Sequence, residues 1–140
     1  MCIFQLLDEK KIMNIRSGWC RVQGNNSEAH FEKDVRVDIG TIRITGEMAE
    51  FLYDEVTKNL KSMVISGGVK VTDEGRWATA EKVKVLFAEN EFVLQGNPRV
   101  VQNDNELRGE EIRLLDGGKK VKVLKARARL DADDAERMRQ

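Results

Sequence analysis

The sequence reads LQGNPRV at residues 94–100, and this stretch matches ISGGVKV at residues 65–71 and FEKDVRV at residues 31–37. The copies are offset by 34 residues (65 − 31) and then by 29 (94 − 65). In each copy, apolar residues flank a turn-forming centre. The repetition indicates that one strand–turn–strand unit recurs along the chain.

A second block repeats at the same offsets, which excludes a chance match of one short stretch. It reads ITGE at residues 44–47, ATAE at residues 78–81 and LRGE at residues 107–110. Repeated units of this kind stack on a shared core and leave open sheet edges at both ends of the stack.

The chain outside the repeat also alternates in the manner of β-strands. Alternating β-branched and aliphatic residues predict strands, and they occur at Val35/Val37, Ile42/Ile44, Val69/Val71, Val83/Val85, Ile112/Leu114 and Val121/Val123. Turn-forming clusters rich in Gly, Asn and Asp separate these runs about every ten residues, as in an all-β meander. The sequence therefore predicts an all-β fold.

Residues 47–60 also fit an amphipathic helix, because Met48, Phe51 and Val56 lie near helical spacing. The repeat favours a strand instead, since residues 49–53 align with the alternating residues 83–87. We therefore predict a strand over 47–53 and a longer, charged loop over 54–62, with a single helical turn possible in the loop.

The composition bounds the class of protein. The chain has 140 residues, enough for one domain with a real core, and its 24 basic and 24 acidic residues balance. A balanced charge argues against a general nucleic-acid binder, and no run is long enough to cross a membrane. The apolar run within residues 1–11 is too short for a signal peptide, and charged residues follow it at once.

The chain divides by pattern into three parts. Residues 1–14 are expected to be a leader that is a short helix or flexible, residues 15–130 the β domain, and residues 131–140 a charged tail that is frayed or weakly helical. Cys2 and Cys20 fit no zinc or redox motif. They form a disulfide in an oxidising compartment or stay as two thiols, and the spacing does not decide between these.

Nothing in the sequence supports catalysis, a metal site or a cofactor. The single histidine, His30, lies beside Phe31 at a strand start, and a lone histidine of this kind is expected to be inert. No nucleophile elbow, phosphate-binding glycine loop or metal-ligand spacing occurs. Trp19, Tyr53 and Trp77 are expected to pack at the edge of a core or the mouth of a cavity rather than to form a stacking platform.

One face of the predicted strands is apolar and the alternating face is largely charged. The apolar face consists of Val35, Val37, Ile42, Ile44, Phe51, Ile65, Val69, Val71, Val83, Val85, Leu94, Val100, Leu107, Ile112 and Leu114. It is either a closed core or, if two sheets splay apart, a groove for acyl chains. Few large aromatics stand on it, which is compatible with space for a ligand.

Residues 92–112, which contain Gly96-Asn97-Pro98 and then Leu107-Arg108-Gly109-Glu110, resemble the OstA-like, LptA-type family of periplasmic lipopolysaccharide-transport proteins. The similarity extends over about residues 15–124. Asp34 and Gly68 depart from it, because asparagine is commoner at both positions.

The resemblance implies an open β-jelly roll whose apolar groove shelters the lipid A acyl chains of lipopolysaccharide in the periplasm. It also implies homo-oligomers and pairing with other OstA-like domains, edge strand on edge strand, as a bridge to the outer membrane. Alternatives are an LptC-type component of the inner-membrane complex, the amino-terminal domain of the outer-membrane protein, or a structural adaptor without a lipid ligand. An enzyme acting on envelope glycans would need a carboxylate pair that the sequence does not show.

The segments near 15–22 and 119–129 flank the repeats and are expected to form the two assembly edges. Lys119 to Arg129 contains six basic residues and no acidic one, and its alternation predicts a last edge strand.

Overall fold

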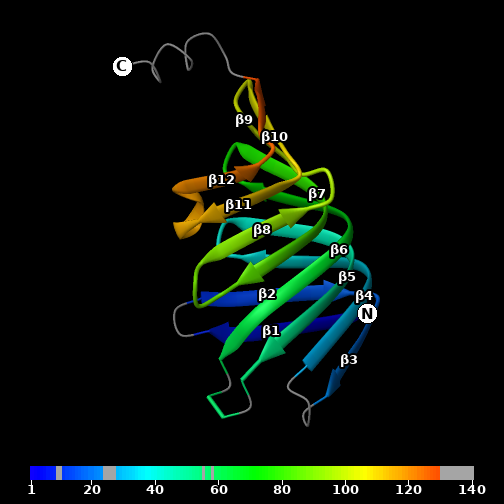
Figure 1. Ribbon diagram of the computed structural model, residues 1–140. Helices are drawn as coiled ribbons and strands as arrows, with labels where there is room; N and C mark the ends of the chain where they lie inside the picture. Colours follow the sequence, from blue (N-terminus) through cyan, green and yellow to red (C-terminus); the bar gives the residue numbers. More distant parts are fainter. Residues whose placement is uncertain (9–10, 24–27, 55, 58, 130–140) are drawn as a thin grey trace.

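The computed structural model describes residues 1–8, 11–23, 28–54, 56–57 and 59–129. The chain is all-β, as predicted, and every strand pairing in it is antiparallel (Figure 1). The strands are β1 (Cys2–Asp8), β2 (Lys11–Ser17), β3 (Trp19–Gln23), β4 (Glu28–Ile39), β5 (Ile42–Tyr53), β6 (Leu60–Asp73), β7 (Arg76–Leu86), β8 (Glu91–Gln95), β9 (Arg99–Gln102), β10 (Asn105–Arg108), β11 (Glu111–Leu115), β12 (Lys120–Leu124) and β13 (Arg127–Arg129), with one 3₁₀ turn, η1 (Asp116–Gly118).

The strands form one continuous sheet with two halves, because β4 to β7 are long enough to contribute to both. In the β3 half, β3 is followed by residues 28–32, 48–53, 60–66 and 82–86 and then by β8, β11 and β12. In the β1 half, β1 and β2 are followed by residues 35–39, 42–46, 69–73 and 76–80 and then by β9, β10 and β13. This is the open β-jelly roll expected from the sequence.

The two halves meet at a fold line, which the repeat creates. Register shifts interrupt the ladders between Glu32 and Val35, Thr45 and Met48, and Ser66 and Val69. Each copy of the first block places two successive residues at positive φ there, namely Lys33 and Asp34, Gly67 and Gly68, and Gly96 and Asn97. Glycine, asparagine and aspartate tolerate this left-handed backbone best, so Asp34 and Gly68 keep the geometry although they depart from asparagine.

Close approach at the fold line also selects glycine. A Cβ on Gly96 would lie 2.4 Å from Cβ of Glu81, and one on Gly67 would lie 2.7 Å from Cβ of Glu47. These glutamates end the second repeated block, so the two blocks face each other where the strands bend. The repeat therefore specifies the bend as well as the strands.

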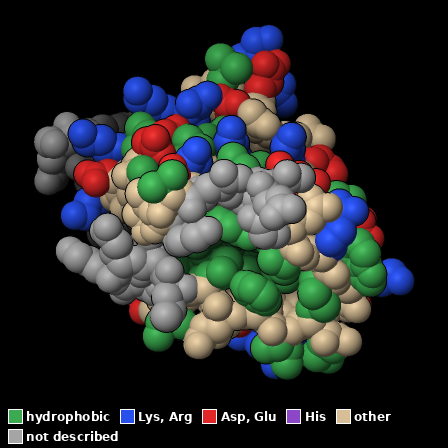
Figure 2. Space-filling model, turned by 90° about the horizontal axis from the view of Figure 1, so that it is seen from below, with side chains coloured by type: hydrophobic (Ala, Val, Ile, Leu, Met, Phe, Trp, Pro, Cys, Tyr) green, Lys and Arg blue, Asp and Glu red, His purple; other side chains and the backbone are tan. Residues whose placement is uncertain are grey.

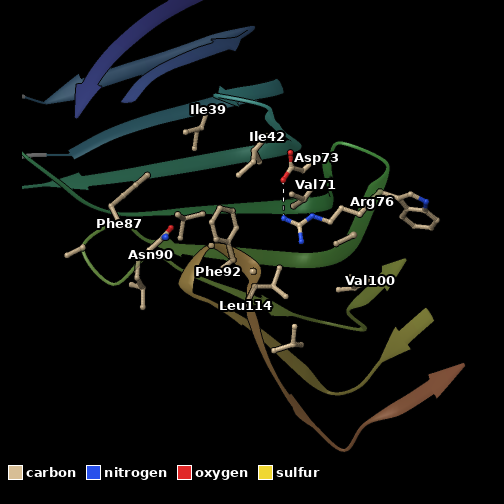
Figure 3. Close-up of a pocket in the computed structure, with 18 of the residues that line it drawn as sticks. Ile39, Ile42, Val71, Asp73, Arg76, Phe87, Asn90, Phe92, Val100 and Leu114 are labelled. Atoms are coloured by element: carbon tan, nitrogen blue, oxygen red, sulfur yellow. Dashed lines mark hydrogen bonds and ion pairs between the residues drawn. The ribbon is translucent and has the colours of Figure 1, made fainter. Parts of the chain in front are cut away.

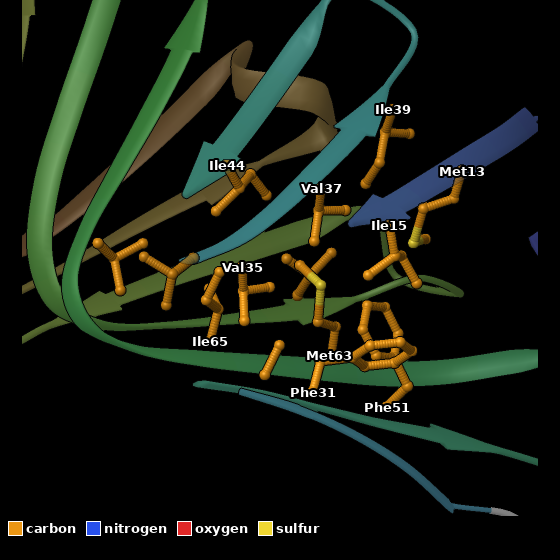
Figure 4. Packing of buried hydrophobic residues seen from close by; sticks show 14 of the residues in the cluster. Met13, Ile15, Phe31, Val35, Val37, Ile39, Ile44, Phe51, Met63 and Ile65 are labelled. Atoms are coloured by element: carbon orange, nitrogen blue, oxygen red, sulfur yellow. The ribbon is translucent and has the colours of Figure 1, made fainter. Parts of the chain in front are cut away.

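The core fills the space between the halves nearest the fold line. Phe31 and Phe51 are fully buried, and their rings meet edge to face with centroids 5.5 Å apart. Val35, Ile44 and Ile65 are equally buried and, with these rings, gather between strands of both halves (Figure 4). Burying side chains of this size contributes about 1.5–3 kcal/mol each.

The expectation for residues 1–14 is wrong, because a hairpin replaces the predicted helix or flexible leader. β1 pairs with β2 from Cys2↔Ser17 to Asp8↔Lys11, and β2 pairs with β4. Phe4 and Leu6 pack against the core beside the buried Met13. Apolar residues alternate in these segments, but the charged residues 8–11 between them obscure the pattern.

The strand predicted over 47–53 is confirmed, since β5 runs to Tyr53. The loop is shorter than the predicted 54–62, because β6 begins at the buried Leu60. Asp54 accepts backbone hydrogen bonds from Thr57 and Val56, which lower the pKa of its carboxyl group. The predicted last strand is two strands, β12 and β13, and the predicted tail at 131–140 lies outside the described residues.

Candidate functional site

A cavity of about 660 Å³ opens between the halves on the side away from the fold line. Its walls come from the hairpin tips of the β1 half and from the loops that end β7 and β11 in the β3 half. Seen from below, hydrophobic side chains gather in the hollowed middle of the molecule (Figure 2). Buried side chains fill the interior near the fold line, whereas a cavity remains open between these tips.

The cavity walls are mainly apolar. Ile39, Ile42 and Val71 line it from the β1 half, and Phe92 and Leu114 face them from the β3 half (Figure 3). Apolar walls with a few polar groups at one side are typical of small-ligand sites. An alkyl chain placed here would leave water for apolar contacts, so the cavity suits an apolar ligand.

The polar side of the cavity is an ion pair at the mouth. Arg76 Nη2 donates to Asp73 Oδ2 at 3.1 Å (Figure 3). Thr41 Oγ1 donates to Asp73 Oδ1 at 2.6 Å. The hydrogen bond from Thr41, followed by the contact with Arg76, lowers the pKa of the Asp73 carboxyl group. This carboxylate therefore stays ionised and holds the guanidinium at the rim.

The same arginine reaches across the mouth toward η1. A Cβ on Gly118 would lie 3.2 Å from Nη1 of Arg76, and Gly118 has a φ of 93°. The positive φ selects glycine at this position, and the close guanidinium leaves little room for a side chain.

The residues predicted as a groove all face the interior, but they divide into two groups. Five of them line the cavity: Ile42, Val71, Val85, Val100 and Leu114. Nine are buried core residues nearer the fold line: Val35, Val37, Ile44, Phe51, Ile65, Val69, Val83, Leu94 and Ile112. Leu107 is half-buried against the core and does not line the cavity.

Several lining residues escaped the sequence analysis. Ile39 stands in a stretch that reads as a turn, and Phe92 precedes the repeated block although it alternates with Leu94. Asp73 belongs to a turn signal, and Arg76 follows that signal directly. No local pattern connects Asp73 and Arg76 to the η1 glycines, because they meet only across the two halves.

The sheet has edge strands at both ends of the molecule. β1 and β3 are the edges at one end, and β12 and β13 are the edges at the other. The predicted edge segment 15–22 is only partly at an edge, because residues 15–17 pair with β1 and only the β3 part of the segment is an edge strand. A disulfide between Cys2 and Cys20, with Cα atoms 6.1 Å apart, joins β1 to β3.

The remaining singled-out residues lie apart from the cavity or at its margin. His30 contacts Glu32 through Nε2 at 2.7 Å and Glu50 through Nδ1 at 3.2 Å. Trp19 packs edge to face on His30. Trp77 borders the cavity, but its ring contacts Lys70 and Arg99 on the outer face of the sheet. The described residues include no cluster of three or more metal-ligating side chains and no helix long and apolar enough to cross a membrane.

Comparison with known proteins agrees with this architecture. Residues 14–116 match the family model described as LptA/(LptD N-terminal domain) LPS transport protein. The fold is similar to the crystal structure of LptH from Pseudomonas aeruginosa, described as the LptA homologous periplasmic component of the lipopolysaccharide transport device. That similarity has a TM-score of 0.78 at 16% sequence identity and covers 85% of this chain and 94% of the other.

None of the curated protein sequences compared with the chain matches it. The family match spans most of the chain, including β3 to β11 and nearly all of the cavity. The chain therefore belongs to the LptA/(LptD N-terminal domain) family of LPS transport proteins.

Proposed function

We propose that the chain is a non-enzymatic, periplasmic carrier that shelters acyl chains of lipopolysaccharide in its cavity. The observation that carries this proposal is the apolar cavity at the open side of the jelly roll, in a chain that belongs to an LPS transport family. The disulfide between Cys2 and Cys20 supports an oxidising compartment such as the periplasm.

The cavity size suits a carrier better than a permanent store. Its volume of about 660 Å³ lies within the range of about 300–1,000 Å³ typical of small-ligand pockets. Each buried CH₂ contributes about 0.8 kcal/mol, so complete burial of several long chains would make release very slow. Partial shelter keeps the affinity close to that of the next site, and transfer onward then needs no chemical step in this domain.

Adjacent residues on β9 provide a matched test of the cavity. Val100 lines it, whereas Val101 pairs with Trp77 on the outer face of the same half-sheet, and both are half-buried. We expect Val100→Glu to weaken binding of a fluorescent acyl probe about 10-fold or more, because a carboxylate would enter an apolar site. Val101→Glu should leave binding nearly unchanged.

Lipopolysaccharide should displace the probe from the wild-type chain. A chain that folds but binds neither probe nor lipopolysaccharide would be a structural adaptor. Val71→Arg gives a second cavity variant, and the circular dichroism of each variant shows whether it has folded.

We further propose that copies assemble end to end, with β1 and β3 of one copy against β12 and β13 of the next. Edge strands carry unpaired backbone groups that a neighbouring strand can satisfy. Val22 on β3 and Leu124 on β12 support such a contact, since they are 44% and 55% exposed on these edges.

The assembly is tested by light scattering over a range of concentrations. Val22→Lys or Leu124→Lys should reduce the oligomer size, whereas Val56→Lys, in the loop between the two inner strands β5 and β6, should not. Equal oligomer size in all three variants would exclude these edges.

A further inference from the structure

Strand register aligns six basic residues in one row across the outer face of the β1 half. Neighbouring partners run Arg16↔Arg36↔Thr45↔Lys70↔Thr79↔Arg99↔Arg108↔Arg127. Their sequence neighbours Ile15, Val37, Ile44 and Val69 are buried, so strand alternation directs the row outward. The described strands place no carboxylate in this row.

The next row on the same face adds two arginines and two acids. It contains Asp38, Arg43, Trp77, Glu106 and Arg129. The outer face of the β3 half differs, because carboxylates such as Glu32, Glu50 and Glu111 stand in rows that also hold basic residues. Positive charge is therefore concentrated on one face of a chain whose formal net charge is zero.

The charge is densest near β9, β10 and β13. We define the basic cluster as Lys70, Arg99, Arg108, Arg127 and Arg129, of which Lys70 and Arg99 lie over the ring of Trp77. Like charges directly opposite each other on neighbouring strands destabilise a sheet, so this arrangement has an energetic cost. Glu106 offsets part of it through contacts with Arg99 and Arg108.

Trp77 adds an amphipathic side chain to the cluster. Lys70 Nζ lies 5.6 Å and Arg99 Cζ 5.0 Å from its ring centroid. A partly exposed indole among cations is typical of surfaces that meet the headgroup region of a bilayer.

We propose that the basic cluster binds the surface of a bilayer that contains anionic phospholipid. Arginine forks match phosphate oxygens in pairs, and each basic residue near an anionic bilayer contributes favourably to binding. The five cations of the cluster have one carboxylate, Glu106, in contact with two of them, so most of the positive charge is left for phosphate groups.

The sheet twist limits this contact to the cluster. Neighbouring strands rotate by about 20–25°, and β9 and β10 stand steeply where β2 lies across the view (Figure 1). Four strand spacings separate β6 from β13, or about 19 Å, which is a small enough patch to meet a flat surface. Arg16 and Arg36, at the far end of the row, face another direction.

The test is co-sedimentation of the full chain with phosphatidylcholine vesicles, with and without phosphatidylglycerol. We expect binding only to the anionic vesicles at low salt, and loss of that binding at high salt. Arg127→Gln with Arg129→Gln should lower the partition coefficient about 30-fold, or about fivefold for each cation.

The matched control is Lys120→Gln with Lys122→Gln, which removes the same charge from the other edge strand at the same end of the molecule. This control and Arg16→Gln should each change binding by less than about threefold. Equal losses in both double variants, or no binding to anionic vesicles, would overturn the proposal. Binding to soluble polyglutamate without binding to vesicles would overturn it too and assign the face to an acidic protein.

This inference does not depend on acyl-chain binding. The Arg127→Gln, Arg129→Gln variant should bind the fluorescent acyl probe as the wild type does, because the cluster lies on the opposite face of the sheet from the cavity. A wild type that binds anionic vesicles but no probe would contradict the carrier function and leave the membrane contact standing.

Discussion

Gly96→Ala tests whether the fold line depends on close approach of the two repeated blocks. Gly96 has a φ of 78°, and an added Cβ would lie 2.4 Å from Cβ of Glu81. Gly75→Ala is a matched control, since Gly75 has a φ of 79° but nothing within 4 Å of the added atom. Both variants suffer the same backbone strain, and only Gly96→Ala suffers the overlap.

The magnitudes separate the two effects. Left-handed backbone costs an alanine about 1–2 kcal/mol, and overlap in a packed site costs about 1–3 kcal/mol more. Gly75→Ala should therefore lower the free energy of unfolding by about 1–2 kcal/mol and Gly96→Ala by about 2–5 kcal/mol. For a domain of this size, the difference between the variants corresponds to a shift in Tm of about 3–10 °C.

Urea denaturation followed by tryptophan fluorescence measures both values, and equal m-values would show that the denatured states are comparable. The same loss in both variants would refute the reasoning, because it would mean that the sheet accepts a side chain at its bend without cost. Gly68→Ala, at a φ of 55° and with open space, should follow Gly75→Ala.

Three further predictions concern stability. Replacing Cys2 and Cys20 with serine should lower the free energy of unfolding by about 3 kcal/mol, because the disulfide closes a loop with a sequence separation of 18. In urea denaturation, reductant should destabilise the wild type but not this variant. Hydrogen bonds from Arg99 and Arg108 lower the pKa of the Glu106 carboxyl group from its ordinary 4.5 to about 2, so the stabilisation by this carboxylate is present above pH 4.5 and is lost as the pH falls toward 2. The difference in stability between the wild type and Glu106→Gln should close over that pH range, and a difference independent of pH would contradict this reasoning. Phe31→Ala should lower the free energy of unfolding by about 3–5 kcal/mol, since the ring is fully buried and contacts the rings of Phe4 and Phe51. A loss under about 1 kcal/mol in the same assay would mean that neighbouring side chains fill the space left by the ring.

The repeat made most of the strands predictable, because each copy carries both the alternation and the turn residues. The repeat correctly predicted a strand at residues 47–53, although the spacing of apolar residues there also fits an amphipathic helix. The pairing of β1 with β2 was missed because these strands lie outside the repeat and the charged residues 8–11 interrupt their short apolar pattern. Its place in the sheet depends on pairing with β4, which no local pattern reports.

The cavity was only partly predictable. Alternation identifies which side chains face inward, and all the predicted groove residues do. It does not report how far the two halves have separated at each position, and this distance decides whether Val37 is core and Val71 is cavity wall. The basic row has the same origin, since Arg16 and Arg127 become members of one row only through the register of eight strands.

The position of the disulfide makes the two ends of the molecule mechanically unlike. Cys2 and Cys20 tie the outermost strands of both halves at one end through a side-chain bond that reductant can break, whereas at the other end the backbone of residues 125–126 joins β12 to β13 permanently. Reduction would therefore release the link between the edge strands at one end of the jelly roll and leave the link at the other end intact. In a row of identical copies, every junction would join an end that reductant can open to an end that it cannot, which gives the row a direction.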